Sequence, residues 1–69
     1  MGLRKIQNEL GRRLRKLRTT RGLSQEELAF EVEISRDHLS NIERGKYPIN
    51  IKTLYKLAVF FEVDMKYFF

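Results

Sequence analysis

The sequence predicts a compact all-α domain of five helices. Apolar residues recur at spacings of three and four along most of the chain, which is the period of a helix with one buried face. Side chains that cap helix N-termini stand before four of these stretches, at Ser24, Ser35, Asn50 and Asp64. No strand is expected, and the length of 69 residues predicts one domain over 1–69.

The first predicted helix carries an apolar stripe and ends before Gly22, a residue that suits the position after a helix C-terminus. The stripe is formed by Leu3, Ile6, Leu10, Leu14 and Leu17. Two short helices follow at about 25–32 and 36–44, joined by a tight turn, and Gly45 closes the second. The apolar set of this pair is Leu28, Val32, Ile34, Leu39 and Ile42, with the small Ala29 where the first helix must approach the second.

The last two predicted helices lie beyond a loop at 46–50. The fourth helix begins after Asn50 and is expected to bury Ile51, Leu54, Leu57, Ala58 and Phe61. A turn at Glu62 and Val63 follows. Asp64 then caps a final short helix, which ends in Tyr67, Phe68 and Phe69.

The helix at about 36–44 presents a polar outer face. Residues four apart lie on the same side of a helix, so turning Leu39 and Ile42 toward the core leaves the polar side chains outside. These are Arg36, Asp37, Ser40, Asn41 and Arg44. A helix that lies in the DNA major groove needs such a face, with long donors and short polar groups near its N-terminus. A capping box of Ser24 and Glu27 begins the helix before it.

Three motifs stand in order along the chain: LGRRLRKLRTTRGLSQEELA, ISRDHLSNIERGK and TLYKLAVFFEVD. Through them the chain resembles the Cro and phage-repressor type of helix-turn-helix regulator, from roughly residue 10 to its end. The resemblance implies a lambda-repressor-like DNA-binding domain that reads DNA through the helix at about 36–44. The family usually has glycine in the turn between the two helices, where this chain has Glu33. A left-handed backbone at Glu33 would cost ~1 kcal/mol or somewhat more.

Base contacts are expected from the start and the outer face of the recognition helix. The candidates are Ser35, Arg36, Asp37, Ser40 and Asn41. Arg36 is the strongest, because a guanidinium that bonds both O6 and N7 of guanine discriminates by ~1–3 kcal/mol; the alternative is a phosphate contact. Asn41 suits adenine N6 and N7. Asp37 accepts from cytosine N4 or holds Arg36 in place, and the two serines bond a base or a phosphate.

Phosphate contacts are expected around both ends of the helix pair. The candidates are Ser24, Gln25, Arg44, Lys46 and Tyr47. Gln25 opens the first helix of the pair, where its amide and the backbone N–H groups can meet a phosphate, and the resemblance implies the same role. Arg44, Lys46 and Tyr47 resemble the second phosphate clamp of the family. The alternative is that they are solvated loop residues.

Arg18 and Glu43 are predicted to form a structural ion pair. Arg18 follows Leu14 by four and Glu43 follows Leu39 by four, so each lies beside a buried stripe. Each alone would be partly desolvated, which is costly, and the resemblance also pairs these two positions. Removing one partner of a well-buried pair costs up to ~3–5 kcal/mol.

Aromatic residues gather at the end of the chain. Six of the eight lie in the last 15 residues: Tyr55, Phe60, Phe61, Tyr67, Phe68 and Phe69. Phe61 and Phe68 are expected in the core, and the other four exceed what one small core requires. A contiguous exposed apolar patch marks an interface, so we predict that these four form a homodimer interface. They are Tyr55, Phe60, Tyr67 and Phe69. The alternative is that these rings cover Leu3 and Ile6.

Basic charge is concentrated at the start of the chain. The formal net charge is +5; residues 1–21 hold eight bases against one acid, whereas residues 22–34 hold four acids and no base. Lys and Arg side chains that neutralise phosphates supply most non-specific DNA affinity. The basic residues on the outer side of the first helix either form a solvated face or also steer the approach to a polyanion. They are Arg4, Lys5, Arg12 and Arg13.

Composition argues against several other classes. The chain has no cysteine, a single histidine and no glycine-rich phosphate loop, so we expect no enzyme activity, no metal site and no cofactor. No apolar run approaches the ~20 residues that span a bilayer, and the N-terminus lacks a secretory apolar region. A cytoplasmic location without membrane or small-molecule partners is therefore expected.

Together these features predict sequence-specific binding to double-stranded DNA. The expected protein is a small dimeric repressor or autoregulator that reads a palindromic operator. The alternative is a protein-interaction module, either an antitoxin or a regulatory subunit, that keeps the fold with weak or no DNA binding. The basic and polar face of the helix at about 36–44 favours DNA, and salt-dependent binding to DNA separates the two.

Overall fold

Helices account for all the regular structure in the computed structural model, which describes residues 2–46 and 48–69. The elements are α1 (Leu3–Thr20), α2 (Gln25–Glu31), α3 (Arg36–Glu43), α4 (Ile51–Phe61) and the short 3-10 helix η1 (Met65–Phe68). The all-α prediction is confirmed, with the final helix formed as a 3-10 turn. Within the described residues, none of the helices combines the length and apolar character that crossing a bilayer requires.

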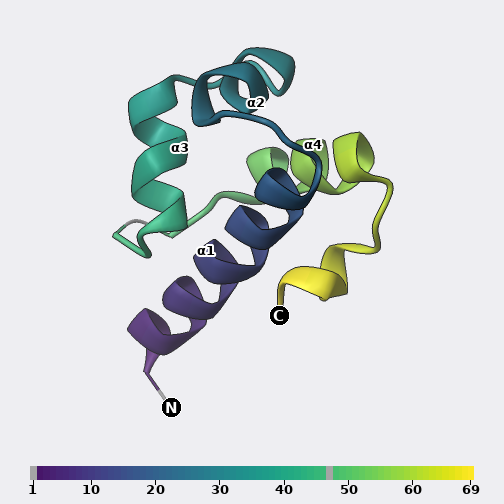
Figure 1. Cartoon of the computed structure of the whole chain (residues 1–69). Helices are drawn as coiled ribbons and strands as arrows, with labels where there is room; N and C mark the ends of the chain where they lie inside the picture. The colour runs from purple at the N-terminus through teal and green to yellow at the C-terminus, as the bar shows by residue number, and fades with distance from the viewer. Residues whose placement is uncertain (1, 47) are drawn as a thin grey trace.

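The helix α1 forms the spine of the domain (Figure 1). It packs against α3 on one side and against η1 on another, while α2 packs on α3 and α4 packs on η1. Apolar side chains from all five elements meet between these helices, and seven of them are almost fully buried. They are Leu14, Leu28, Leu39, Ile42, Leu57, Phe61 and Phe68.

Side-chain caps begin four of the elements, as predicted. Ser24 and Glu27 form the full capping box, with the Ser24 hydroxyl accepting from the Glu27 N–H at 3.0 Å and the Ser24 N–H donating to Glu27 Oε1 at 2.8 Å. Ser35 and Asn50 each accept from the backbone N–H three residues on, at 3.0 and 2.8 Å. Asp64 accepts from the N–H two residues on, at 3.1 Å. Each cap satisfies a backbone donor that the first helical turn cannot pair.

Two turns use left-handed backbone at a non-glycine residue. Glu33, between α2 and α3, has a φ of 60°, and Glu62, after α4, has a φ of 57°. An L-residue pays roughly 1–2 kcal/mol for this conformation. Glu33, where the resemblance implies glycine, therefore adopts a strained backbone, whereas the left-handed backbone at Glu62 was not foreseen from the sequence.

Three apolar residues that the sequence assigned to buried stripes are exposed. Leu3 and Ile6 lie in the first turns of α1, and Ile51 is the first residue of α4 with 71% of its surface exposed. These positions lie at helix ends, where the neighbouring elements no longer cover the stripe. The three side chains, together with Phe69, line an open cavity of about 240 Å³. The expectation that Ile51 is buried was wrong.

Close approach of α1 and α3 depends on Gly11. A Cβ atom at this position would lie 2.5 Å from the carbonyl oxygens of both Ile42 and Glu43, far inside van der Waals contact. Gly45, which follows the C-terminal end of α3, is buried and adopts a φ of 70°. It lies against Asn8 of α1. The two glycines let the C-terminal end of α3 lie directly on α1.

Candidate nucleic-acid interface

The helix α3 turns its polar residues away from the core. Leu39 and Ile42 are buried, so the opposite side of the helix faces outward. Of the five predicted base contacts, Ser35, Arg36 and Asp37 are exposed, and Ser40 and Asn41 are half-buried. The first three stand at the N-terminal end of α3, which is the part of a recognition helix that contacts base edges in the major groove.

Asn41 already has a partner on the protein. Its Oδ1 accepts a hydrogen bond from Arg44 Nη2 at 3.2 Å. A bidentate contact to adenine uses that oxygen as acceptor and the amide nitrogen as donor. Because an amide oxygen has two lone pairs, the bond from Arg44 leaves it able to accept from a base as well.

A buried ion pair links α1 to the end of α3. Arg18 Nε lies 2.6 Å from Glu43 Oε2, and Arg18 Nη2 lies 3.0 Å from Glu43 Oε1. The two side chains keep only 10% and 3% of their surface exposed. Arg18 Nη1 also donates to the Leu23 carbonyl oxygen at 2.8 Å. The structure thus brings together the two residues that the sequence paired.

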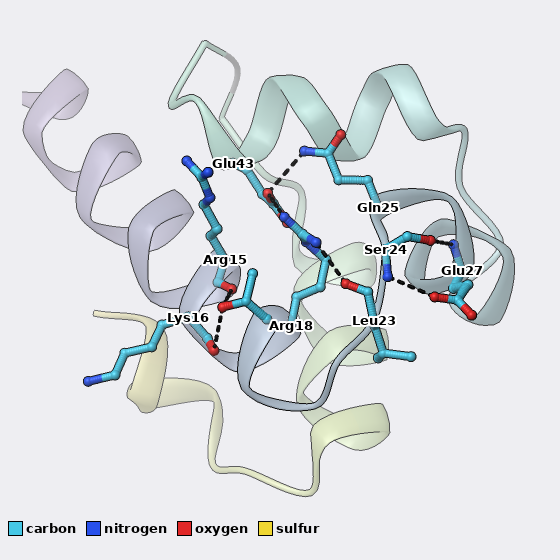
Figure 2. Close-up of polar contacts among 9 residues, drawn as sticks. Arg15, Lys16, Arg18, Leu23, Ser24, Gln25, Glu27 and Glu43 are labelled. Carbon is cyan, nitrogen blue, oxygen red and sulfur yellow. Dashed lines mark hydrogen bonds and ion pairs between the residues drawn. The ribbon is translucent and has the colours of Figure 1, made fainter.

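Gln25 joins this pair from α2. Its Nε2 donates to Glu43 Oε1 at 3.0 Å, so Arg18 and Gln25 converge on one carboxylate from two helices (Figure 2). This contact was not predicted, because nothing in the spacing of residues 18 apart shows that their side chains meet. The contact could have been inferred from one pattern: a glutamine stands at the first position of one helix, and a glutamate stands at the last position of the next.

The predicted phosphate contacts gather near this network. Gln25 is anchored to Glu43, the last residue of α3, and exposed Arg44 and Lys46 follow it directly. Ser24 is exposed, and its hydroxyl is engaged in the capping box. Tyr47, the fifth candidate, lies outside the described residues. The start of α2 and the end of α3 therefore present amide and cationic donors from adjoining positions.

Three arginines of the basic N-terminal segment donate hydrogen bonds to backbone carbonyl oxygens of other segments. Besides Arg18, Arg13 Nη1 donates to the Tyr67 carbonyl oxygen at 3.0 Å, and Arg21 Nη2 donates to the Phe61 carbonyl oxygen at 2.9 Å. The Arg21 guanidinium also lies 5.3 Å from the centre of the Phe61 ring. The description of Arg13 as part of a solvated face was wrong, because it is half-buried against the C-terminal segment.

Other basic residues of α1 do remain on the surface. Arg4, Lys5 and Arg12 are exposed, and Arg12 forms an ion pair with Glu9 one turn before it. The neighbouring Arg12 guanidinium, which donates to Glu9, holds the pKa of that carboxyl below its usual range. Such exposed pairs contribute little to stability, so these side chains mainly shape the charge of the surface.

The predicted dimer residues divide into two kinds. Tyr55 and Phe69 are each 61% exposed. Phe60 and Tyr67 are half-buried against the domain's own core, edge to face with Phe61 and Phe68 at centroid distances of 5.0 and 5.5 Å. Phe69 lines an open cavity together with Leu3 and Ile6, and these two residues remain exposed. Sequence reasoning missed that Ile51 and Val59 lie exposed one turn on either side of Tyr55.

Acidic and histidine side chains form no cluster of three or more that could hold a metal ion within residues 2–46 and 48–69. His38 is half-buried on α3, and its backbone N–H is used by the Ser35 cap. The polar groups of this face are therefore hydrogen-bond donors and acceptors without a metal-binding arrangement among the described residues.

Comparison with known proteins agrees with this geometry. A family model described as helix-turn-helix matches residues 14–68. The HTH-type transcriptional regulator RamB of Mycobacterium tuberculosis is 39% identical over 59 residues, which are 86% of this chain and 12% of RamB. The chain therefore spans only a small part of that relative's length.

Two solved structures share the fold. The restriction-modification controller protein C.AhdI of Aeromonas hydrophila superposes with a TM-score of 0.84 at 37% identity, over 90% of this chain and 94% of that one. A transcriptional regulator of the HTH_3 family from Vibrio cholerae superposes with a TM-score of 0.88 at 32% identity, over 99% of this chain and 38% of that one.

Proposed function

Because the chain belongs to the helix-turn-helix family of DNA-binding transcriptional regulators, we propose that it reads a palindromic operator as a homodimer and acts as a small repressor or autoregulator. The α3 helix enters the major groove, with Arg36 as the principal base reader. Gln25, Arg44 and Lys46 bind phosphates on either side. Double-stranded DNA and a second copy of the chain are the partners, and the cytoplasm is the proposed location.

One observation carries this proposal. The outward face of α3 offers exposed Ser35, Arg36 and Asp37 at its N-terminus, while exposed Arg44 and Lys46 follow its C-terminus. Base readers at one end of a helix and phosphate-binding cations at the other are what a recognition helix needs to fix its register on the duplex. This basic and polar face argues against the alternative of a pure protein-interaction module, either an antitoxin or a regulatory subunit.

Dimerisation is supported by the apolar surface of α4. Ile51, Tyr55 and Val59 are spaced by four and are all exposed, so they form one apolar stripe along the helix. A symmetric dimer buries the same patch on both subunits. We therefore centre the proposed interface on Tyr55 and this stripe, with Phe69 beside it through the cavity it shares with Ile51. Phe60 and Tyr67 contribute their exposed edges.

The test begins with selection of bound sequences from a random DNA pool, followed by two substitutions. Arg36→Ala should relax the preference at one base pair per half-site, at a cost of ~1–3 kcal/mol on the selected operator. Lys46→Ala should weaken all sequences alike and make the salt slope shallower by about one per site. Equal loss on operator and random DNA for Arg36→Ala removes it from the base readers.

Salt dependence separates DNA binding from the protein-interaction alternative. Log affinity for the operator should fall linearly with log salt, with a slope of about −0.9 per phosphate neutralised. Binding that hardly changes between low and physiological salt, or a failure to select any sequence, argues for the interaction module.

A further inference from the structure

We propose that Glu43 is a positioning residue for DNA binding, which orients the Gln25 amide toward a DNA phosphate while Arg18 neutralises its charge. The proposal rests on the proposed function and deepens it. It assigns the buried Arg18–Glu43 pair a role in ligand contact that a purely structural ion pair does not have.

The geometry centres on one oxygen atom. Glu43 Oε1 accepts from Arg18 Nη2 and from Gln25 Nε2, each at 3.0 Å, while Oε2 accepts from Arg18 Nε at 2.6 Å. Arg18 is held at its other end by the Leu23 carbonyl oxygen at 2.8 Å. The carboxylate is thus fixed by α1, and in turn it fixes the side chain at the start of α2 (Figure 2).

This contact decides which end of the Gln25 amide faces which way. A carboxylate accepts hydrogen bonds but cannot donate them, so the nitrogen of the amide must lie toward Glu43. That bond uses one of the two Nε2 hydrogens and leaves the other free. A phosphate also only accepts, so it needs this free N–H; a freely rotating amide could instead present its oxygen, which repels the phosphate.

The negative charge of Glu43 also has to be neutralised. A bare carboxylate beside a DNA phosphate repels it, and this repulsion grows where water is excluded. Arg18 supplies a matching positive charge through two hydrogen bonds, and a bidentate pair of this kind has fixed geometry. The start of α2 and the end of α3 therefore present the donors of Gln25 and Arg44 without a net negative charge from Glu43 beside them.

The test compares two double variants that both lack the buried charges. In Arg18→Met with Glu43→Gln, the carboxamide oxygen can still accept from Gln25, although its nitrogen can also donate, so the preferred amide orientation is weakened and not abolished. In Arg18→Met with Glu43→Leu, a side chain of similar size offers no acceptor. Both keep the net charge of the native protein and leave no unpaired buried ion, so neither carries the main penalty of breaking such a pair. Circular dichroism first establishes that both are folded.

Binding is then measured on the selected operator with single phosphates replaced in turn by neutral methylphosphonates. In the native protein, replacement of the phosphate that Gln25 contacts should weaken binding about tenfold, the size of one hydrogen bond to a charged group; the phosphates of Arg44 and Lys46 should respond as well. Gln25→Ala identifies that phosphate, because it should become insensitive to this replacement. The Glu43→Gln double variant should keep most of the affinity loss caused by this replacement, and the Glu43→Leu double variant should no longer show it.

The outcomes are distinct. If the methylphosphonate replacement weakens operator binding in both double variants, or in neither, Glu43 does not position Gln25. Such a result leaves the proposed DNA binding intact. If the native protein selects no operator from the random pool, the proposed function itself fails. If the replacement weakens operator binding in the Glu43→Gln double variant but not in the Glu43→Leu double variant, the result supports Glu43 as the group that orients the Gln25 amide.

Discussion

At the scale of single residues, the turn between α2 and α3 is the place where this chain departs from its family. Glu33 holds the left-handed backbone that glycine usually supplies, at a φ of 60°. Its carboxylate lies 3.9 Å from Lys56 Nζ, but the Glu33 side chain is 82% exposed. An ion pair so open to solvent is worth little, so the turn carries strain that this contact does not offset.

Replacing Glu33 tests this strain directly. Glu33→Gly and Glu33→Ala both remove the charge, but only glycine relieves the left-handed conformation. We expect Glu33→Gly to be more stable than Glu33→Ala by about 1 kcal/mol, after the larger entropy of glycine in the unfolded chain is allowed for. Urea unfolding measures the difference, and a Glu33→Ala variant more stable than Glu33→Gly would show that the turn is unstrained, because only the entropy of glycine would then separate them.

The capping box makes a pH-dependent contribution at a single residue. The Ser24 backbone N–H and the Ser24 hydroxyl, both hydrogen-bonded to Glu27, hold the pKa of the Glu27 carboxyl below its ordinary value of 4.5. A carboxyl whose pKa is lowered by folding stabilises the native state above its unfolded pKa and loses that contribution as the pH falls through the folded pKa.

Comparison with Glu27→Gln isolates this effect. The native protein should exceed the variant in stability at neutral pH, and the gap should narrow progressively as the pH drops below 4.5. Chemical unfolding at a series of pH values measures it. The control is Glu26→Gln, which removes an exposed carboxylate from the same helix outside the box. A gap that is constant with pH contradicts the assignment.

At the scale of elements, the contact between α1 and α3 organises the domain. Gly11 allows the two backbones to touch, and the Arg18–Glu43 pair closes the same interface nearer the C-terminus of α1. Because α3 carries the proposed base readers, this contact sets how the recognition helix is presented. Arg13 and Arg21 perform a comparable task on another side of α1, where they hold the backbone of the C-terminal segment.

Gly11→Ala tests the α1–α3 contact. Alanine favours helix by about 1 kcal/mol over glycine, yet its methyl group would lie 2.5 Å from two backbone carbonyl oxygens that cannot rotate away. We expect a net loss of about 1–3 kcal/mol in the free energy of unfolding. Thr20→Ala, at an exposed position of the same helix, is the control and should be neutral or stabilising. A stabilised Gly11→Ala would mean that the helices separate easily.

At the scale of the whole molecule, the proposed DNA binding and the proposed dimerisation use separate surfaces. The outward side of α3 and its flanking cations face the proposed DNA site, whereas the apolar stripe of α4 is free for a second subunit. In Figure 1, η1 and the C-terminus lie across α1 from α3. Phe69 lines a cavity with Ile51, the first residue of the stripe, so the proposed dimer surface is centred on Tyr55 with Phe69 at its margin.

The dimer prediction is tested with charged substitutions on the apolar surface. Tyr55→Asp combined with Phe69→Asp should give a folded monomer with much weaker operator binding, because burying each ring is worth up to ~1.5–3 kcal/mol. Phe30→Asp is the matched control: Phe30 is 80% exposed but lies on α2, so it should leave the dimer intact. Sedimentation at tens of micromolar reports the oligomeric state. A monomeric native protein, with variants that bind operator normally, contradicts the assignment.

Local sequence determined the elements, their caps and the polar side of α3. Helical periodicity acts over three or four residues, and a cap acts over two or three, so Ser24, Ser35, Asn50 and Asp64 could be assigned without knowing where the helices pack. The location of Leu39 and Ile42 on one side of α3 followed from the same spacing. The base-reading and phosphate-binding roles remain predictions built on that pattern.

Tertiary structure alone decided which of these surfaces meet. The bond from Gln25 to Glu43, the carbonyl contacts of Arg13 and Arg21, and the need for glycine at position 11 join residues that are remote in the sequence. Exposure of Ile51 likewise depends on where its neighbours end. Periodicity specifies the direction in which a side chain leaves its helix, but burial and hydrogen bonding depend on what lies there, and that is set by how the helices pack.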